Sequence, residues 1–173
     1  MNPILKFYLK SFGFFFIAFM IVDLMLWLFF DKIVIQTKIS LLSSLFLSSI
    51  FTYYTYNNLK KLGIERFTNQ HFKLSQFKII PYTKTIKDAF LVIKNNSFMD
   101  GKNVYLLDQK IEIESYESTA SWGEIICIKF CGQLEMNTLL EITSKPRFRF
   151  QWFDWGQNRT NVEMISKLLL NQA

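Results

Sequence analysis

Residues 11–30 read SFGFFFIAFMIVDLMLWLFF, and this stretch decides the architecture of the chain. Asp23 is its single ionisable residue. A helix that crosses the hydrocarbon core of a bilayer needs about 20 predominantly apolar residues. The stretch lacks the small-residue cleavage site of a signal peptide, so we expect a transmembrane helix that is retained in the mature protein.

A second apolar stretch follows at residues 39–56, ISLLSSLFLSSIFTYYTY. It is shorter, rich in serine, and ends in a tyrosine cluster of the kind found at membrane–water interfaces. The connection between the two stretches is too short to hold a domain. Residues 1–57 are therefore predicted to form a hairpin of two transmembrane helices in contact with the lipid bilayer.

The basic residues around the hairpin predict its orientation. Short segments rich in Lys and Arg stay on the cytoplasmic side of a membrane. The loop carries two lysines next to Asp31, whereas the two flanks carry five basic residues. We expect a two-pass protein with both termini and the soluble part in the cytoplasm. The flanking residues are Lys6, Lys10, Lys60, Lys61 and Arg66, and the loop residues are Lys32 and Lys38.

Asp23 needs a partner, because a carboxylate at membrane depth costs several kcal/mol unless it is paired or protonated. Antiparallel pairing of the two helices brings it level with the segment from Ser44 to Ser48. We therefore expect a polar helix–helix contact among these three residues, with the small serines allowing close approach, or an equivalent contact with another subunit. A proton or ion relay is the alternative, but such pathways normally use several ionisable groups.

The composition suits a membrane protein better than a nucleic-acid-binding one. Twenty basic and 14 acidic residues give a net charge of +6, and half of the residues are hydrophobic. A basic balance suits nucleic acid or anionic lipid. No recognised nucleic-acid-binding module accompanies the charge, so lipid is the simpler partner. Cys127 and Cys131 lie four residues apart, which fits neither a disulfide nor a metal site.

Residues 58–82 are basic and are predicted to form a juxtamembrane connector that closes at Pro81. Residues 83–173 are predicted to fold as a small α+β domain, an antiparallel meander of about four strands packed against two helices. Thr85 and Asp88 form a capping box at the first helix. We expect a turn at residues 131–132 and a continued strand alternation through residues 147–153. The predicted strands lie at residues 104–107, 110–116 and 122–130 and in the later half of residues 134–146, where Leu140 and Ile142 alternate with polar neighbours.

The closing helix is preceded by a turn. In the sequence Asp154-Trp155-Gly156, the glycine is expected to supply an unusual backbone conformation. Asn158 or Thr160 would then cap the helix, and Thr160 with Glu163 fits the pattern of a capping box.

No catalytic motif is present: the sequence contains no glycine-rich nucleotide loop, no HExxH, no paired metal motif and no nucleophile elbow. Glu112, Glu114 and Glu117 read as a solvated strand face. The sequence therefore favours a protein that is not an enzyme and that uses no cofactor or metal.

A basic face is predicted near the C-terminal end of the sheet. Arg147 and Arg149, with Lys129 beside them and Trp152 and Trp155 nearby, could hold anionic headgroups or a phosphate-bearing ligand. The alternative is an ordinary solvated strand face.

The tail from Ser144 to Arg147, followed by the D-x-G-x-N sequence at residues 154–158 and an amphipathic helix, resembles small uncharacterised bacterial domains whose tail reads S-x-S-R…D-x-G-x-N-R. The resemblance covers roughly residues 85–170 and departs from the pattern at Pro146. It implies a domain associated with the bacterial envelope, here at the inner (cytoplasmic) membrane. It transfers no catalytic residue.

Two hypotheses of function follow. In the first, the chain is a non-enzymatic accessory or structural subunit whose hairpin docks against other membrane subunits or a second copy. In the second, it is a membrane-anchored sensor or effector whose soluble domain binds a small anionic ligand or a lipid headgroup.

Overall fold

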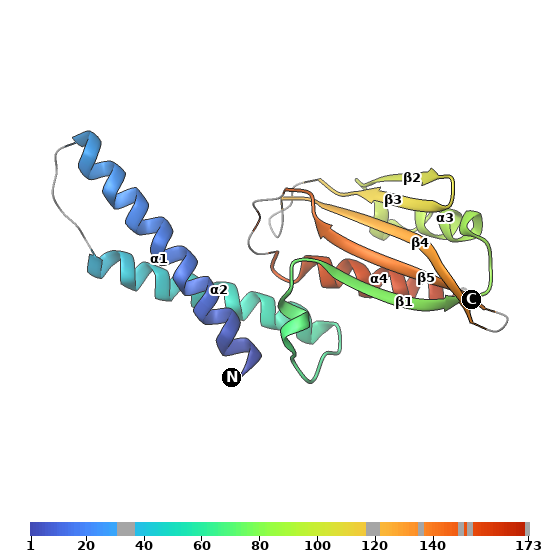
Figure 1. Cartoon of the computed structure of the whole chain (residues 1–173), viewed down its shortest axis with the longest axis horizontal. Helices are drawn as coiled ribbons and strands as arrows, with labels where there is room; N and C mark the ends of the chain where they lie inside the picture. The colour runs from blue at the N-terminus through green and yellow to red at the C-terminus, as the bar shows by residue number, and fades with distance from the viewer. Residues whose placement is uncertain (31–36, 117–121, 135–136, 149–150, 152–153, 172–173) are drawn as a thin grey trace. The chain divides into compact units, whose positions relative to one another are not determined.

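The computed structural model describes residues 1–30, 37–116, 122–134, 137–148, 151 and 154–171, and it divides into two compact units. Unit 1 spans Met1–Phe72 and unit 2 spans Lys73–Ala173 (Figure 1). The described residues form four α-helices and five strands, in addition to two short 3-10 helices. In unit 1 these are α1 (Pro3–Phe30), α2 (Thr37–Lys61) and η1 (Asn69–Phe72); in unit 2 they are β1 (Gln76–Tyr82), α3 (Ile86–Lys94), η2 (Ser97–Met99), β2 (Asn103–Leu107), β3 (Lys110–Glu114), β4 (Glu124–Leu134), β5 (Asn137–Pro146) and α4 (Gln157–Leu170).

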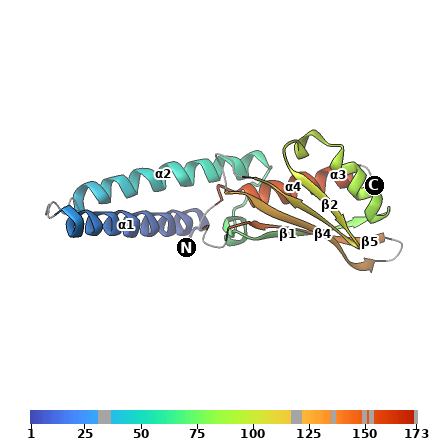
Figure 2. The same cartoon turned by 90° about the horizontal axis from the view of Figure 1, so that it is seen from above.

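The helices α1 and α2 pack against each other as a hairpin, as the sequence predicts (Figure 2). Over Pro3–Leu28, α1 is long and apolar enough for a membrane span or a signal sequence, and few of its residues are fully buried. No second described helix reaches that apolarity. The serines and threonines of α2 account for the difference, because each lowers the average hydropathy of the helix.

The contact between the two helices is lined by small polar residues. They recur along α2 every three or four residues, and residues at this spacing share one face of a helix. The hydroxyl of Ser44 donates to the carbonyl of Ser40, and that of Ser48 to the carbonyl of Ser44, each at 2.6 Å. These two serine hydroxyls are thereby satisfied within α2. Its buried polar residues are Ser40, Ser44, Ser48, Thr52 and Thr55.

Asp23 makes the polar contact between helices that the sequence predicts, but with a different serine. The Ser40 hydroxyl donates to its carboxylate at 2.6 Å. Ser40 lies one helical turn before Ser44 and two before Ser48. Asp23 therefore meets α2 one to two turns nearer the start of that helix than predicted.

The α+β unit is built on a five-stranded antiparallel sheet with the strand order β1-β5-β4-β3-β2. Strands β2 to β5 form the predicted meander. The prediction missed β1, which was assigned to the connector because Pro81 and the alternating lysines suggested a helix end. Proline is tolerated in β1 because it is an edge strand, where an outward-facing amide needs no partner in the sheet.

Both helices of unit 2 cover the same face of the sheet: α4 packs on β1 and β5, and α3 on β2 and β3 (Figure 1). This arrangement confirms the predicted two-layer α+β fold. The residues on the covered face alternate with exposed or half-buried ones, as a half-buried sheet requires. The core includes Ile80, Tyr82, Ile93, Ile111, Ile113, Ile126, Ile128, Leu140, Ile142, Ile165 and Leu169.

Two predicted features of the meander are wrong. Cys131 and Gly132 do not form a turn, because β4 continues to Leu134 and absorbs the irregularity as a bulge between Phe130 and Gly132. A bulge adds one residue without ending the strand. The last strand also ends earlier than predicted, at Pro146. Residues 149–150 and 152–153 of the predicted alternation, which include Arg149 and Trp152, lie outside the described residues.

Capping is confirmed at α3 and differs at α4. Thr85 and Asp88 form the predicted reciprocal box, whose hydrogen bonds hold the pKa of the Asp88 carboxyl below its usual value. At α4 the cap residue is Gly156, with φ of 79°, so the box predicted from Thr160 is wrong. Thr160 lies inside the helix and donates to the carbonyl of Gly156 at 3.2 Å.

Asp154 takes over the capping of α4. Its carboxylate accepts hydrogen bonds from the backbone N–H of Gly156 at 3.1 Å, and from the backbone and side-chain nitrogens of Asn158 at 2.8 and 2.7 Å. Asn158 in turn accepts from the Ser144 hydroxyl of β5 at 2.6 Å. The D-x-G-x-N sequence therefore attaches the first turn of α4 to the sheet.

We expect Asp154→Ala to lower the free energy of unfolding by about 1 to 3 kcal/mol, because it leaves buried donors without an acceptor.

Burial raises the pKa of the Asp154 carboxyl above its usual value of 3.8. The folded state therefore binds the proton more tightly than the unfolded state. The stability of the wild type relative to Asp154→Ala should rise as the pH falls from the raised pKa towards 3.8. Unfolding of both proteins in detergent across this range tests the sign, and a falling difference would contradict it.

Candidate functional site

A cleft of about 720 Å³ lies where β3 and β5 end and β4 begins. Among the described residues it is lined by Tyr116, Trp122, Arg147 and Phe148. Tyr116 follows β3, Trp122 precedes β4, and Arg147 and Phe148 follow β5. The cleft is thus formed by the residues that enter and leave neighbouring strands.

The backbone at the strand ends fixes the shape of this cleft. The N–H of Arg147 donates to the carbonyl of Gly123, and the N–H of Ser115 to the carbonyl of Glu124, each at 3.0 Å. Gly123 has φ of 92°, and a Cβ at this position would lie 2.7 Å from the Ser115 carbonyl oxygen. The residue between Trp122 and β4 must therefore be glycine for the three strand ends to come this close.

Three aromatic rings and one cation face solvent in the cleft. Tyr116, Trp122 and Phe148 are 55%, 58% and 49% exposed. Trp122 and Phe148 pack edge to face with ring centroids 5.6 Å apart. The Arg147 guanidinium lies 5.7 Å from the centroid of the Tyr116 ring, a cation–π distance. The surface suits a ligand that combines negative charge with an apolar part.

Polar neighbours hold these side chains in place. The Asn103 amide donates to the Tyr116 hydroxyl at 2.6 Å. A terminal nitrogen of Arg147 lies 3.8 Å from a carboxylate oxygen of Glu114. This distance is longer than that of a charge-assisted hydrogen bond. Glu114 therefore attracts and orients the Arg147 guanidinium without forming a hydrogen bond to that nitrogen.

A serine and a glutamate lie directly behind the cleft. The Ser115 hydroxyl donates to the Glu124 carboxylate in a short hydrogen bond and accepts from the Glu124 backbone N–H at 2.8 Å. A hydroxyl beside a carboxylate can signal a nucleophile. Here Ser115 and Glu124 are only 6% and 3% exposed, so the pair is out of reach of a substrate and closes the end of the sheet.

Of the two predicted anion-binding residues that the structure describes, it brings Arg147 to the cleft and places Lys129 elsewhere. Arg147 lies there and Arg149 lies outside the described residues. Lys129 is five residues along β4 from Glu124, roughly 17 Å at about 3.4 Å per residue. It pairs with Glu141 at 3.6 Å instead. Tyr116 and Trp122 were missed, although an aromatic residue beside a strand end was a visible signal.

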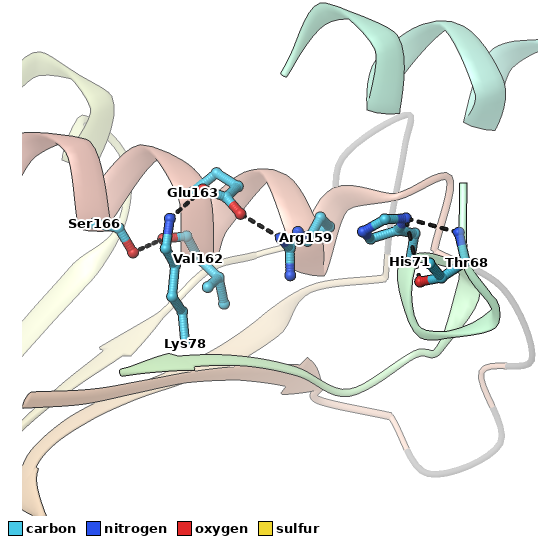
Figure 3. Close-up of polar contacts among 7 residues, drawn as sticks. All are labelled: Thr68, His71, Lys78, Arg159, Val162, Glu163 and Ser166. Atoms are coloured by element: carbon cyan, nitrogen blue, oxygen red, sulfur yellow. Dashed lines mark hydrogen bonds and ion pairs between the residues drawn. The ribbon is translucent and has the colours of Figure 1, made fainter. Parts of the chain in front are cut away.

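A second charged cluster joins β1 to α4 (Figure 3). The Glu163 carboxylate contacts Lys78 of β1 at 2.7 Å and Arg159 of α4 at 2.5 Å. Glu163 was predicted to cap α4 and instead lies in the second turn of the helix, buried between two cations. One inward lysine on β1 is thus balanced by a buried acid, which explains why β1 tolerates a charge on its covered face.

The remaining candidates for chemistry are local structural groups. In a turn of unit 1, Nδ1 of His71 accepts from the backbone N–H of Thr68 at 3.1 Å (Figure 3). Cys127 and Cys131 are free thiols, and burial raises the pKa of the Cys127 thiol, which lowers its reactivity at neutral pH. In the described parts of the chain, no group of three His, Cys, Asp or Glu residues is placed to hold a metal ion.

No protein-family model, curated protein or solved structure matches this chain. The resemblance of its tail to uncharacterised bacterial envelope-associated domains therefore stays a prediction.

We expect Gly123→Ala to destabilise unit 2 by about 1 to 3 kcal/mol, because the new Cβ meets backbone in a conformation that other residues rarely adopt. Gly132→Ala is the matched control. It lies within β4, the strand that Gly123 directly precedes, and its nearest neighbour is the Leu139 side chain at 3.8 Å. Thermal unfolding in detergent compares the two variants, and equal losses would contradict this account of Gly123.

Proposed function

We propose that this chain is a non-enzymatic accessory subunit of a larger assembly in a bacterial cytoplasmic membrane. The hairpin α1–α2 docks against other transmembrane helices or a second copy, and unit 2 is displayed in the cytoplasm. The observation that supports this proposal is that the hairpin distributes its polar and apolar side chains in the opposite way to a water-soluble helix pair. Small polar side chains such as Ser44 and Ser48 are buried in the hairpin, and many of its large apolar side chains face outward.

The outward residues of the hairpin match what lipid requires. Leu42 and Phe46 of α2 are 65% and 67% exposed, and Leu28 and Ile17 of α1 are 64% and 60% exposed. A water-soluble helix pair would bury such side chains and expose its serines. A bilayer instead gains from apolar side chains on the outside of a helix pair and from small residues between the helices.

The same reasoning supports α2 as a second membrane span. Average hydropathy counts every side of a helix, whereas lipid meets only the outer side. The serine hydroxyls along α2 bond to carbonyls of their own helix, and Ser40 bonds to Asp23. These three serine hydroxyls therefore have hydrogen-bond partners inside the hairpin, and a short two-pass hairpin places both termini on one side. The flanking basic residues favour the cytoplasmic side.

Alkaline carbonate treatment of native membranes, followed by purification of the tagged full chain in mild detergent, tests the proposal. The chain should stay in the membrane pellet and copurify with a stoichiometric membrane protein or with a second copy of itself. Release by carbonate would overturn the membrane span. A monomer without any partner would overturn the role as a subunit.

The serine face of α2 offers a sharper test with a matched pair of variants. Ser48 is fully buried in the contact with α1, and the neighbouring Ser49 is exposed. Both hydroxyls donate to the carbonyl four residues earlier, at 2.6 and 2.8 Å. We expect Ser48→Leu to disrupt the hairpin and reduce partner recovery several-fold, whereas Ser49→Leu, which adds a lipid-facing apolar group, should leave both unchanged. Crosslinking between cysteines introduced in α1 and α2 measures the hairpin, and equal effects of the two variants would contradict the packing.

A second candidate function rests on the aromatic cleft. In this alternative the chain is a membrane-anchored sensor or effector, and the cleft binds a small anionic ligand or a lipid headgroup through Arg147. Its support is the exposed cation beside three exposed rings. If Arg147→Glu combined with Arg149→Glu leaves ligand binding and phenotype unchanged in a folded protein, this candidate is eliminated.

A further inference from the structure

We propose that the aromatic cleft docks unit 2 on the surface of an anionic phospholipid bilayer. Arg147 binds a headgroup phosphate, and Trp122 and Phe148 lie at the level of the headgroups. This inference rests on the proposed membrane anchorage of the hairpin and specifies the ligand of the second candidate function.

The side chains of the cleft have the chemistry of the membrane interface. Tryptophan and tyrosine concentrate at headgroup depth, because each joins an apolar ring to a polar group. In this cleft Trp122, Tyr116 and Phe148 are all about half exposed and lie within one cluster. A water-soluble domain gains nothing from leaving three neighbouring rings in water, whereas a domain at a bilayer surface can bury them in lipid.

The charge at the cleft complements an anionic headgroup. Arginine is the side chain best suited to bind a phosphate through two parallel N–H donors. The Arg147 guanidinium lies over the Tyr116 ring and 3.8 Å from Glu114, which fixes its direction and leaves its donors for a closer oxygen. The cleft therefore presents an oriented cation beside its rings.

The chain itself limits how far unit 2 can lie from the bilayer. α2 ends at Lys61 and unit 2 begins at Lys73. A chain segment of this length reaches at most about 40 Å when fully extended. Unit 2 is thereby held at a high effective concentration beside the lipid surface, so even a weak headgroup contact is occupied. A freely diffusing protein would need a larger surface.

The experiment uses the full chain in nanodiscs of phosphatidylcholine alone and of phosphatidylcholine with one quarter phosphatidylglycerol. Hydrogen–deuterium exchange reports on the backbone amides at residues 114–116, 122–124, 145, 147 and 148. We expect these amides to exchange more slowly on the anionic nanodiscs and to lose this protection at high salt, because salt screens the attraction. Elution of the chain with the nanodisc separately tests the anchorage, so a failure of the proposed function is distinguished from a failure of this inference.

Arg147→Glu and Lys129→Glu form a matched pair. Both cations belong to the sheet region, with side chains 45% and 51% exposed, and both pair loosely with one glutamate, at 3.8 and 3.6 Å. Each basic residue near an anionic surface contributes about 1 kcal/mol, so reversal of one charge should lower the ratio of docked to free unit 2 by roughly thirtyfold. We expect this loss for Arg147→Glu and little change for Lys129→Glu. Arg147→Lys should retain most of the protection.

Several results would overturn the inference. Equal protection on both nanodiscs, or equal loss in the two charge-reversal variants, would remove the role of Arg147 at an anionic surface. Protection produced by inorganic phosphate on nanodiscs of phosphatidylcholine alone would identify a small-anion site instead of a lipid surface. Protection seen only together with a copurifying protein would assign the cleft to that partner. If Arg147→Glu unfolds in detergent, Arg147→Gln gives the same comparison with a neutral side chain.

Discussion

The long antiparallel pairing of β4 with β5 is the interaction on which the α+β unit depends. The remaining strands attach on either side of this pair, β1 to β5 and β3 to β4. The covered face of the pair supplies Ile126, Ile128, Leu140 and Ile142 to the core, all without solvent exposure. The bulge between Phe130 and Gly132 lets the pairing continue to its far end, and at its near end the partners Glu124 and Pro146 open into the aromatic cleft. Core and cleft thus depend on the same hydrogen-bond ladder.

The parts of the fold that follow from local periodicity could be predicted from the sequence. The apolar run of α1, the alternation in β3, β4 and β5, and the Thr85 capping box all depend on residues close together in the chain. β1 could not be recognised in this way. Its Lys78 faces inward, and that position is acceptable only because Glu163, 85 residues later, reaches the same place. A local pattern carries no record of a partner so distant.

The candidate site also combines residues that the local sequence reveals with residues that only the folded sheet brings together. Arg147 could be recognised as a candidate because it stands in an alternating basic segment. Tyr116 and Trp122 join it only because three strand ends converge, and that convergence depends on the register of the sheet and on the backbone of Gly123. Lys129 was grouped with Arg147 because both are basic. The register of β4 with β5 instead places Lys129 opposite Glu141, away from Arg147. In the hairpin, Asp23 could be assigned a serine partner from the sequence, but its identity depends on the stagger between the helices, which the loop length alone does not determine.

The proline in β1 has a consequence under the membrane anchorage that we propose. An edge strand presents unpaired backbone groups that can recruit the same strand of another molecule and start an ordered aggregate. Molecules confined to two dimensions meet far more often than molecules in bulk solution, so an open edge is more hazardous there. Pro81 removes one outward donor from the exposed edge of β1, and a continuous intermolecular ladder cannot form across it. The residue that concealed β1 in the sequence thereby protects crowded copies from polymerising through their sheets.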